Sequence, residues 1–431
     1  MTRPAPTAPV PFALLPDTAA VTADGALSIG GGDVLRLAAE HGTPLFVYDE
    51  AHIRARCREA VAAFGEGNVV YATKAFLCRA MARLAHEEGL LLDVASGGEQ
   101  HVALAAGVPA DRLVVHGNNK SMAELRTALG LGVHVLVVDS FDELDRLDTL
   151  HTEGLPVPRV QLRITPGVEA HTHEFVRTGQ EDSKFGFGIR TGAAAAAIER
   201  ARRSPSVELV GLHAHVGSQV FAADSFAKGA EVMAEIARPL GLPMLTLGGG
   251  LGVPYVAGEE APTLTEWGKV VRAAVADAGL GATRLLVEPG RAIVAAAAVT
   301  LYTVGTMKDI PGIRTYVAVD GGMSDNPRPV LYGSGYETFL PRAVAADRPR
   351  EVRVVGKHCE SGDLLVRAGR VPEDLGVGDV LATPVTGAYG HSMGSNYNKV
   401  PRPAVVFVSD GEARLVVRRE TYDDLLATDV G

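Results

Sequence analysis

The chain has 431 residues, 47% of them hydrophobic and 21% charged, so it has enough apolar material for more than one core. Its 41 lysines and arginines against 51 aspartates and glutamates give a formal net charge of −10, which argues against a nucleic-acid-binding protein with a basic surface. The three cysteines, Cys57, Cys78 and Cys359, cannot form a disulfide framework, so we expect a cytoplasmic protein.

The N-terminal part is expected to contribute little to the main fold. Residues 1–24 are rich in alanine and proline and have only one early arginine, which predicts a flexible tail and not a signal peptide. Residues 25–44 are expected to add a strand or short helix that packs on a second, C-terminal domain. The longest nearly uninterrupted apolar run, Ala292–Val304, is shorter than the roughly 18 residues that a membrane helix needs.

Residues 45–294 show a regular alternation of short apolar runs with alanine-rich helical stretches. Eight such runs begin near residues 68, 90, 112, 134, 159, 208, 244 and 284. Alternation of this kind predicts parallel β/α units, and eight of them predict an α/β fold with a (β/α)8 barrel. The runs are apolar throughout and not strictly alternating, which is typical of strands buried on both faces.

The pattern changes after about residue 295. Runs such as TYVAVD, REVRVVG, DLLVRAG and AVVFVS alternate apolar and polar residues, and turn sequences such as DGG and SDGE separate them. Residues 295–431 are therefore predicted to form an antiparallel β-sandwich or β-barrel domain.

Polar or glycine-rich residues follow most of the predicted barrel strands. They are Lys74, Asp93, His116, Asp139, Arg163, His213, His215, Gly248–Gly250 and Glu288. In a (β/α)8 barrel the C-terminal strand ends meet at one mouth, where active sites lie. The long connection Thr165–Gly188 is expected to be a binding loop or lid at the same mouth.

Three of these features suit pyridoxal phosphate. Lys74 is flanked by apolar residues in VVYATKAFL, which favours a neutral, nucleophilic amine that can form a Schiff base. The glycine run in LGGGLG follows the seventh strand and can cradle a phosphate, with Arg291 adding a positive charge. Glu288 follows the eighth strand and could keep the pyridine nitrogen protonated. His215 could stack on the cofactor ring.

A metal site is an alternative interpretation of the same strand ends. His213 and His215 are two residues apart, so on a strand both would point the same way. Metal-dependent hydrolase barrels use such a pair together with further ligands. His116, Asp93 and Asp139 are available for that purpose, but this interpretation gives no role to Lys74 or to the glycine run.

Taken together, the motifs resemble one family, the diaminopimelate decarboxylases, which belong to the fold type III pyridoxal-phosphate decarboxylases. The resemblance extends from about residue 25 to the C-terminus. Its motifs are YATKA, DVASGGE, HGNNKS, GLHAHVGSQ, LGGGLG, EPGRA, DGGMSDNPRPVLYG, GKHCESGD and GAYGHSMGSNYN. It implies an alanine-racemase-like barrel followed by a β domain. It also implies decarboxylation of meso-2,6-diaminopimelate to L-lysine and CO2, the last step of bacterial lysine biosynthesis.

The resemblance also assigns roles to single residues. Lys74 would carry pyridoxal phosphate as a Schiff base, and Cys359 would donate the proton that replaces CO2. The implied cofactor-binding residues are Lys74, His215, Ser218, Gly250, Glu288, Pro289, Gly290, Arg291 and Tyr389. The implied substrate-binding residues are Arg291, Arg328, Tyr332, Glu360 and Tyr389. The protein would be a homodimer in which Cys359 and Glu360 reach the barrel mouth of the neighbouring subunit.

Several other functions remain open from the residues. A decarboxylase acting on ornithine, arginine or a carboxylated polyamine would use the same cofactor residues, although Arg328 suits a substrate with a distal carboxylate. An amino-acid racemase would need an acid–base pair on opposite ring faces, and Glu288 fits decarboxylation better. A non-catalytic pyridoxal-phosphate carrier would not need Cys359 and Glu360. The metal-dependent hydrolase is the remote alternative.

Overall fold

A computed structural model of the protein describes residues 8–167, 182–215 and 217–431. The chain divides into two compact units. The barrel unit holds residues 56–252 and 261–292, and the sheet unit holds the N-terminal segment to residue 55, residues 253–260 and residues 293–431. Within the described ranges, no helix is both long and apolar enough to cross a membrane.

Eight parallel strands form the barrel unit, and they neighbour one another in chain order. They are β5 (Val70–Ala72), β6 (Leu91–Val94), β7 (Leu113–Val115), β8 (Val135–Val138), β9 (Arg159–Thr165), β11 (Glu208–His213), β12 (Met244–Thr246) and β13 (Arg284–Leu286). A bridge between Val69 and Val287 brings β5 beside β13 and closes the barrel. The short strand β10 (Phe187–Gly188) pairs with β9. The predicted (β/α)8 barrel is confirmed, with all eight apolar runs as its strands.

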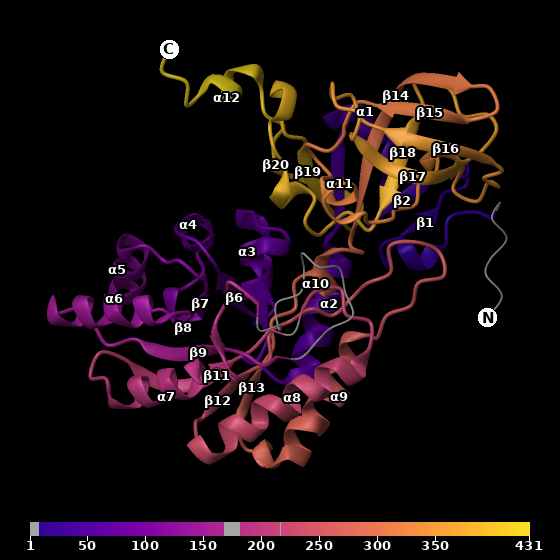
Figure 1. The fold of residues 1–431 in the computed structure, drawn as a ribbon. Coiled ribbons are helices and arrows are strands. Elements are labelled where there is room, and N and C mark those ends of the chain that lie inside the picture. Colours follow the sequence, from indigo (N-terminus) through magenta and orange to yellow (C-terminus); the bar gives the residue numbers. More distant parts are fainter. Residues whose placement is uncertain (1–7, 168–181, 216) are drawn as a thin grey trace. The chain divides into compact units, whose positions relative to one another are not determined.

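Helices connect these strands and lie around the outside of them (Figure 1). They are α3 (Arg79–Glu87), α4 (Gly97–Ala105), α5 (Met122–Leu131), α6 (Phe141–Thr152), α7 (Ala193–Arg203), α8 (Ala223–Ala237) and α9 (Leu264–Val275). Serine or threonine side chains cap α4, α5, α6 and α9 by accepting a backbone N–H of the first turn. Such caps satisfy donors that a helix N-terminus otherwise leaves unpaired, so they define where these helices begin.

The barrel interior is filled by apolar side chains from β5 to β8 and from β11 to β13. This core cluster consists of Val70, Leu91, Val114, Val135, Val137, Val210, Met244 and Leu286. All of them are almost completely buried. The packed interior makes the barrel a rigid support, so the functional side chains are left to the strand ends.

The sheet unit contains one eight-stranded sheet and one three-stranded sheet. The larger sheet runs in the order β17 (Leu364–Val371), β16 (Arg350–Val355), β15 (Arg314–Val319), β14 (Ala298–Ile310), β4 (Leu45–Asp49), β19 (Ala404–Ser409) and β20 (Glu412–Val417), with β18 (Val380–Pro384) also paired to β14. The smaller one holds β1 (Ala20–Val21), β2 (Leu27–Ile29) and β3 (Gly32–Asp33). The predicted antiparallel arrangement needs correction, because β15 pairs with β16, and β4 with β19, in parallel.

The described residues also form the helices α1 (Val34–His41), α2 (Glu50–Phe64), α10 (Arg291–Val294), α11 (Arg328–Tyr332) and α12 (Tyr422–Leu426). The side chains of α1 and β2 share one buried cluster with β4, β14 and β19. Residues 25–44 therefore pack within the sheet unit.

Two predicted boundaries differ from the structure. Residues 45–49, expected to open the barrel, form β4, which pairs with β14 and β19 of the sheet unit. Residues 8–24, expected to belong to a flexible tail, include Val10, Leu14 and Leu15, which are almost fully buried. Val10 and Leu15 join the core of the sheet unit, so burial of apolar area holds this part of the N-terminal segment in place.

Candidate active site

The predicted strand-end residues of the barrel unit gather at its C-terminal rim. Lys74 lies in the short 3-10 turn Thr73–Ala75 that follows β5, and His116 directly follows β7. His213 ends β11, and Glu288 follows β13 after one residue. The parallel arrangement explains this, since all strands of a barrel point their carboxyl ends to the same face.

Glu288 is held between two histidines from other strands. Its Oε1 lies 2.9 Å from His116 Nε2, and its Oε2 lies 3.0 Å from His213 Nε2. All three side chains are buried. Burial alone would raise the pKa of Glu288, but the two imidazoles and their hydrogen bonds outweigh burial and hold the pKa well below its usual range. The carboxylate is therefore kept ionised inside the barrel mouth.

The pKa values of the two histidines are shifted in opposite directions. Burial lowers the pKa of His213, so its ring is neutral near pH 7. Burial also acts on His116, but the nearby Asp93 and Glu288 outweigh it and raise the pKa of His116. Asp93 Oδ1 lies 3.9 Å from His116 Nε2, and burial raises the pKa of Asp93 itself. Of the two histidines, His116 is therefore the one that more readily carries a positive charge beside Glu288.

Lys74 and His215 lie at the same rim. Burial, followed by the positive charges of Lys74 and Arg163, lowers the pKa of His215 well below its usual value, so the ring is neutral. Its Nδ1 accepts the backbone N–H of Gly249 at 3.3 Å. Lys74 is exposed although Thr73 and Ala75 beside it are buried, which corrects the expectation that apolar neighbours desolvate it.

The glycine run after β12 packs directly on neighbouring backbone. A Cβ added at Gly249 would lie 2.0 Å from the Glu288 carbonyl oxygen, and one added at Gly250 would lie 2.0 Å from that of Gly217. Gly250 also has a φ of +108°, which only glycine adopts freely. Val220 donates its backbone N–H to Gly250 O at 2.9 Å. Glycine is therefore required at positions 249 and 250, because any side chain there would collide with the neighbouring backbone.

Ser218 and Arg291, both predicted at the phosphate, are brought together beside this run. Arg291 begins α10 and is buried, and its Nη2 donates to Ser218 Oγ at 2.9 Å. Pro289, which lies between Glu288 and Arg291 in the chain, accepts the Ala72 backbone N–H through its carbonyl oxygen at 3.1 Å. At Gly290 an added Cβ would lie 3.0 Å from Ala72 O, so the segment packs tightly against β5.

These donors and acceptors fit pyridoxal phosphate. A lysine amine is exposed at the rim, and an ionised carboxylate is present to pair with a protonated pyridine nitrogen. The glycine run, the Ser218 hydroxyl and the Arg291 guanidinium supply the donor types that a phosphate requires.

The same cluster contains the groups that a metal would need. His116, His213 and Glu288 each offer a ligand atom, and these atoms lie within 4.8 Å of one another. His215 is not part of this group, because its Nδ1 is turned to Gly249. Asp139 accepts the Gly186 N–H at 2.6 Å. The predicted metal pair of His213 and His215 is therefore wrong in its geometry within the described residues.

The predicted substrate-binding arginine lies in the sheet unit and is buried. Arg328 begins α11, its guanidinium carbon lies 4.2 Å from the centre of the Tyr255 ring, and its Nη1 donates to Tyr336 Oη at 2.6 Å. No carboxylate lies within 4.0 Å of it in the described part of the chain, and its buried Nε has no hydrogen-bond partner there. A buried cation without a counter-charge is costly, so this position favours an anionic ligand. Tyr332, at the end of α11, is half-buried.

The predicted catalytic cysteine lies on the loop between β16 and β17. Cys359 and the adjacent Glu360 are both exposed, and the Cys359 backbone N–H donates to Asn398 Oδ1 at 3.0 Å. Asp363 anchors the loop by accepting the backbone N–H groups of Met323 at 2.7 Å and His358 at 2.8 Å. The loop is thus fixed on both sides while its thiol stays accessible.

Tyr389 completes the predicted set. It is half-buried and has a φ of +60°, in the left-handed region that non-glycine residues seldom adopt. Such strain is often found at ligand sites. The expected lid Thr165–Gly188 falls largely at residues 168–181, which lie outside the described residues.

Sequence reasoning missed the groups that orient the predicted ones. The sequence predicts His116 only as a strand-end residue and an optional metal ligand, whereas in the structure it binds Glu288. Tyr255 and Tyr336, which enclose Arg328, were not predicted. The only available signal was the position of His116 at a strand end.

The amino-acid sequence is similar to those of known pyridoxal-dependent decarboxylases. Residues 50–295 match the family described as "Pyridoxal-dependent decarboxylase, pyridoxal binding domain". A diaminopimelate decarboxylase from Mycobacterium tuberculosis (strain ATCC 25618 / H37Rv) is 48% identical over 425 residues, which cover 94% of this chain and 95% of the relative. The corresponding protein from Bacillus subtilis (strain 168) is 48% identical over 423 residues, covering 94% and 95%.

A solved structure agrees in fold over almost the whole chain. The crystal structure of diaminopimelate decarboxylase from M. jannaschii in complex with L-lysine has a TM-score of 0.88 and 33% sequence identity, covering 96% of this chain and 98% of that one.

Proposed function

This chain belongs to the diaminopimelate decarboxylase family, and we propose that it removes CO2 from meso-2,6-diaminopimelate and releases L-lysine. The reaction makes it a pyridoxal-phosphate-dependent carboxy-lyase that completes lysine biosynthesis. The observation that carries the proposal is Glu288, an ionised carboxylate held by His116 and His213 at the barrel mouth.

In the proposed site most of the cofactor-binding residues belong to the barrel unit. Pyridoxal phosphate, when bound, withdraws electrons from the carbon that loses CO2. Lys74 would bind the aldehyde carbon of the cofactor, and His215 would stack on its ring. Glu288 would accept a hydrogen bond from the protonated pyridine nitrogen, and its low pKa keeps the carboxylate ionised so that the nitrogen stays protonated. Ser218, the glycine run and Arg291 would hold the phosphate. The other predicted cofactor-binding residues, Pro289, Gly290 and Tyr389, would complete the contacts to the cofactor.

The proposed substrate residues give the specificity. The Arg328 guanidinium binds the distal carboxylate, which is supported by its burial without a counter-charge. Glu360 binds the distal ammonium, and Arg291, Tyr332 and Tyr389 complete the contacts. Cys359 donates its thiol proton to the carbon from which CO2 has left, and its exposure supports this role.

We further propose a homodimer with shared active sites. Cys359 and Glu360 are exposed on the sheet unit, which leaves them accessible to the barrel mouth of a second copy. The cytoplasmic location expected from the cysteine content remains a prediction. The metal-dependent alternative gives no role to Lys74, whereas the family match assigns residues 50–295 to pyridoxal binding.

The proposed reaction can be tested with a panel of substrates. Protein loaded with pyridoxal phosphate is given meso-diaminopimelate, ornithine, arginine or lysine separately, and CO2 release is measured. We expect release from meso-diaminopimelate alone, with one L-lysine formed per CO2, and none with Lys74→Ala. Release from ornithine or arginine instead would keep the cofactor assignment but contradict the roles given to Arg328 and Glu360.

A further inference from the structure

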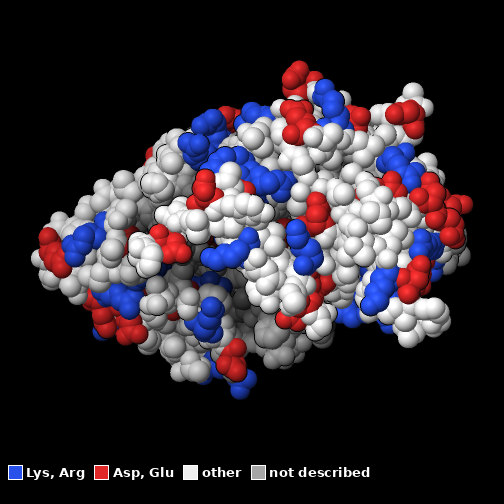
Figure 2. Space-filling view, turned by 90° about the horizontal axis from the view of Figure 1, so that it is seen from above, with Lys and Arg blue, Asp and Glu red and all other residues white. Residues whose placement is uncertain are grey.

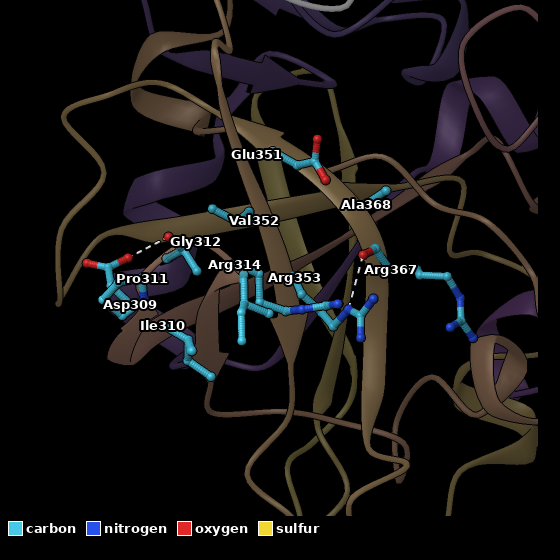
Figure 3. A pocket seen from close by; sticks show the side chains of 12 residues that line it. Asp309, Ile310, Pro311, Gly312, Arg314, Glu351, Val352, Arg353, Arg367 and Ala368 are labelled. Atoms are coloured by element: carbon cyan, nitrogen blue, oxygen red, sulfur yellow. Dashed lines mark hydrogen bonds between the residues drawn. The ribbon is translucent and has the colours of Figure 1, made fainter.

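A second candidate site lies on the sheet unit. A groove of about 660 Å³ surrounds the turn between β14 and β15 and extends over β15, β16 and β17 (Figure 3). Three arginines from three different strands line it: Arg314, Arg353 and Arg367. None of its described lining residues belongs to the predicted cofactor or substrate set.

Strand pairing places Arg314 and Arg353 on one face of the sheet. Tyr316 of β15 pairs with Arg353 of β16 in parallel register, and Arg314 lies two residues from Tyr316 on the same face. The alternate residues Val317 and Val352 are buried, so the arginine face is the outer one. Figure 3 shows Arg314 and Arg353 extending into the groove from these neighbouring strands.

The three guanidinium groups have no carboxylate within 4.0 Å in the described part of the sheet unit. Two acidic residues line the same groove, but both are paired elsewhere. Asp309 binds Arg350 at 3.2 Å, and Glu351 binds Arg370 at 3.5 Å. On the face of the molecule seen in Figure 2, acidic and basic side chains are interspersed.

We propose that this groove binds a small ligand that carries at least two negative groups, phosphates or carboxylates. Neighbouring guanidinium groups without an anion repel one another, and an anion between them removes that repulsion. Arginine also presents paired N–H donors that match phosphate and carboxylate oxygens. The volume is typical of small-molecule sites, and the exposed Ile313 at the turn can cover an apolar part of the ligand.

Binding can be measured by calorimetry, with pyrophosphate and citrate as probes at low salt. The protein is used with pyridoxal phosphate bound, so that the phosphate site of the barrel is filled. We expect Arg353→Gln to raise the Kd of the bound probe at least about threefold, and the triple variant with Arg314→Gln and Arg367→Gln to abolish binding. Arg203→Gln on α7 makes the same charge change at a residue that does not line the groove, and it should leave the Kd unchanged.

The two probes distinguish the ligand chemistries. Binding of pyrophosphate alone would identify a phosphate ligand, binding of citrate alone a carboxylate ligand, and both outcomes support the site. Absence of binding of either probe, or equal weakening by Arg203→Gln, would overturn it. A change of oligomeric mass in the triple variant without any probe binding to the wild type would also overturn it, because the groove would then hold a segment of a second copy.

Discussion

At the scale of single residues, buried charge marks the positions where a ligand is expected. Arg328 is buried between tyrosine rings with no carboxylate nearby in the described structure, whereas buried Arg348 pairs with Glu337 at 2.9 Å. We attribute this difference to function. Arg348 is neutralised by a carboxylate of the protein, whereas Arg328 would be neutralised by a carboxylate of the substrate.

Replacement of this arginine should therefore affect the substrate selectively. We expect Arg328→Gln to lower kcat/KM for meso-diaminopimelate about 100-fold, or roughly 3 kcal/mol, mostly through KM. Arg328→Lys, which keeps the charge but not the paired donors, should lose less. Steady-state kinetics of both variants decides the matter. Unchanged KM in Arg328→Gln would show that this residue does not bind substrate.

Asp325 offers a separate pH-dependent prediction. Burial raises its pKa to about 7. The carboxylate accepts hydrogen bonds from Tyr302 Oη at 2.6 Å and from the Gly322 N–H at 2.7 Å, which favour the charged form, but the effect of burial is larger. Between about pH 4 and 7 the unfolded chain has released a proton that the folded chain keeps. Stability therefore falls as pH rises through this window, by on the order of 4 kcal/mol in total.

The isosteric variant Asp325→Asn should lose this component. We expect its unfolding midpoint in urea, relative to that of the wild type, to rise between pH 4.5 and 7.5. Parallel pH profiles for the two proteins would show that Asp325 does not titrate abnormally.

At the scale of elements, the glycine run after β12 packs against Glu288, which lies just beyond the end of β13. Replacing Gly249 by alanine forces a Cβ to within 2.0 Å of the Glu288 carbonyl, so the loop or the strand end must move. We expect Gly249→Ala to cost about 2 kcal/mol or more and to weaken pyridoxal phosphate binding at least about tenfold.

A helix glycine provides the matched control for that variant. Gly130 lies in α5 with nothing within 4 Å of an added Cβ, so Gly130→Ala should be neutral or stabilising by about 0.5–1 kcal/mol. Unfolding midpoints and cofactor titration test both. Wild-type cofactor affinity in Gly249→Ala would contradict the role of the run.

The elements also show where sequence reasoning reaches its limit. The barrel strands could be predicted because apolar runs recur with helical stretches between them. β4 is also a short, mostly apolar run, and all five of its residues are buried. Its sequence therefore does not show whether it joins the barrel or the sheet of the other unit. Its partners β14 and β19 lie about 250 and 360 residues later, and only the folded chain shows that pairing.

At the scale of the whole molecule, the site could be predicted where motifs are local. Lys74, the glycine run and Glu288 follow strand ends, so the barrel alone brings them to one rim. The hydrogen bond between His116 and Glu288 joins residues 172 apart, and the ring that covers Arg328 comes from Tyr255 in the short segment 253–260. Contacts of this kind depend on tertiary packing and leave no local pattern.

The proposed shared active site predicts complementation between inactive subunits. Lys74→Ala and Cys359→Ala should each be nearly inactive, but a hybrid dimer would contain one intact site. Random mixing after subunit exchange should therefore restore about a quarter of wild-type activity. Mixing Lys74→Ala with a double variant that carries both changes should restore none. Activity that stays at the level of the parents would mean that Lys74 and Cys359 act within one chain.

The most direct test of the central claim is reconstitution of the cofactor-free protein. Pyridoxal phosphate is added in steps, and visible absorbance and CO2 release from meso-diaminopimelate are recorded on the same sample. We expect the absorbance of the protein-bound Schiff base and the CO2 release to rise together and to saturate at one cofactor per chain, and Lys74→Ala to show neither. Decarboxylation that persists without the cofactor, or saturation of the absorbance with no CO2 release from meso-diaminopimelate, would contradict it.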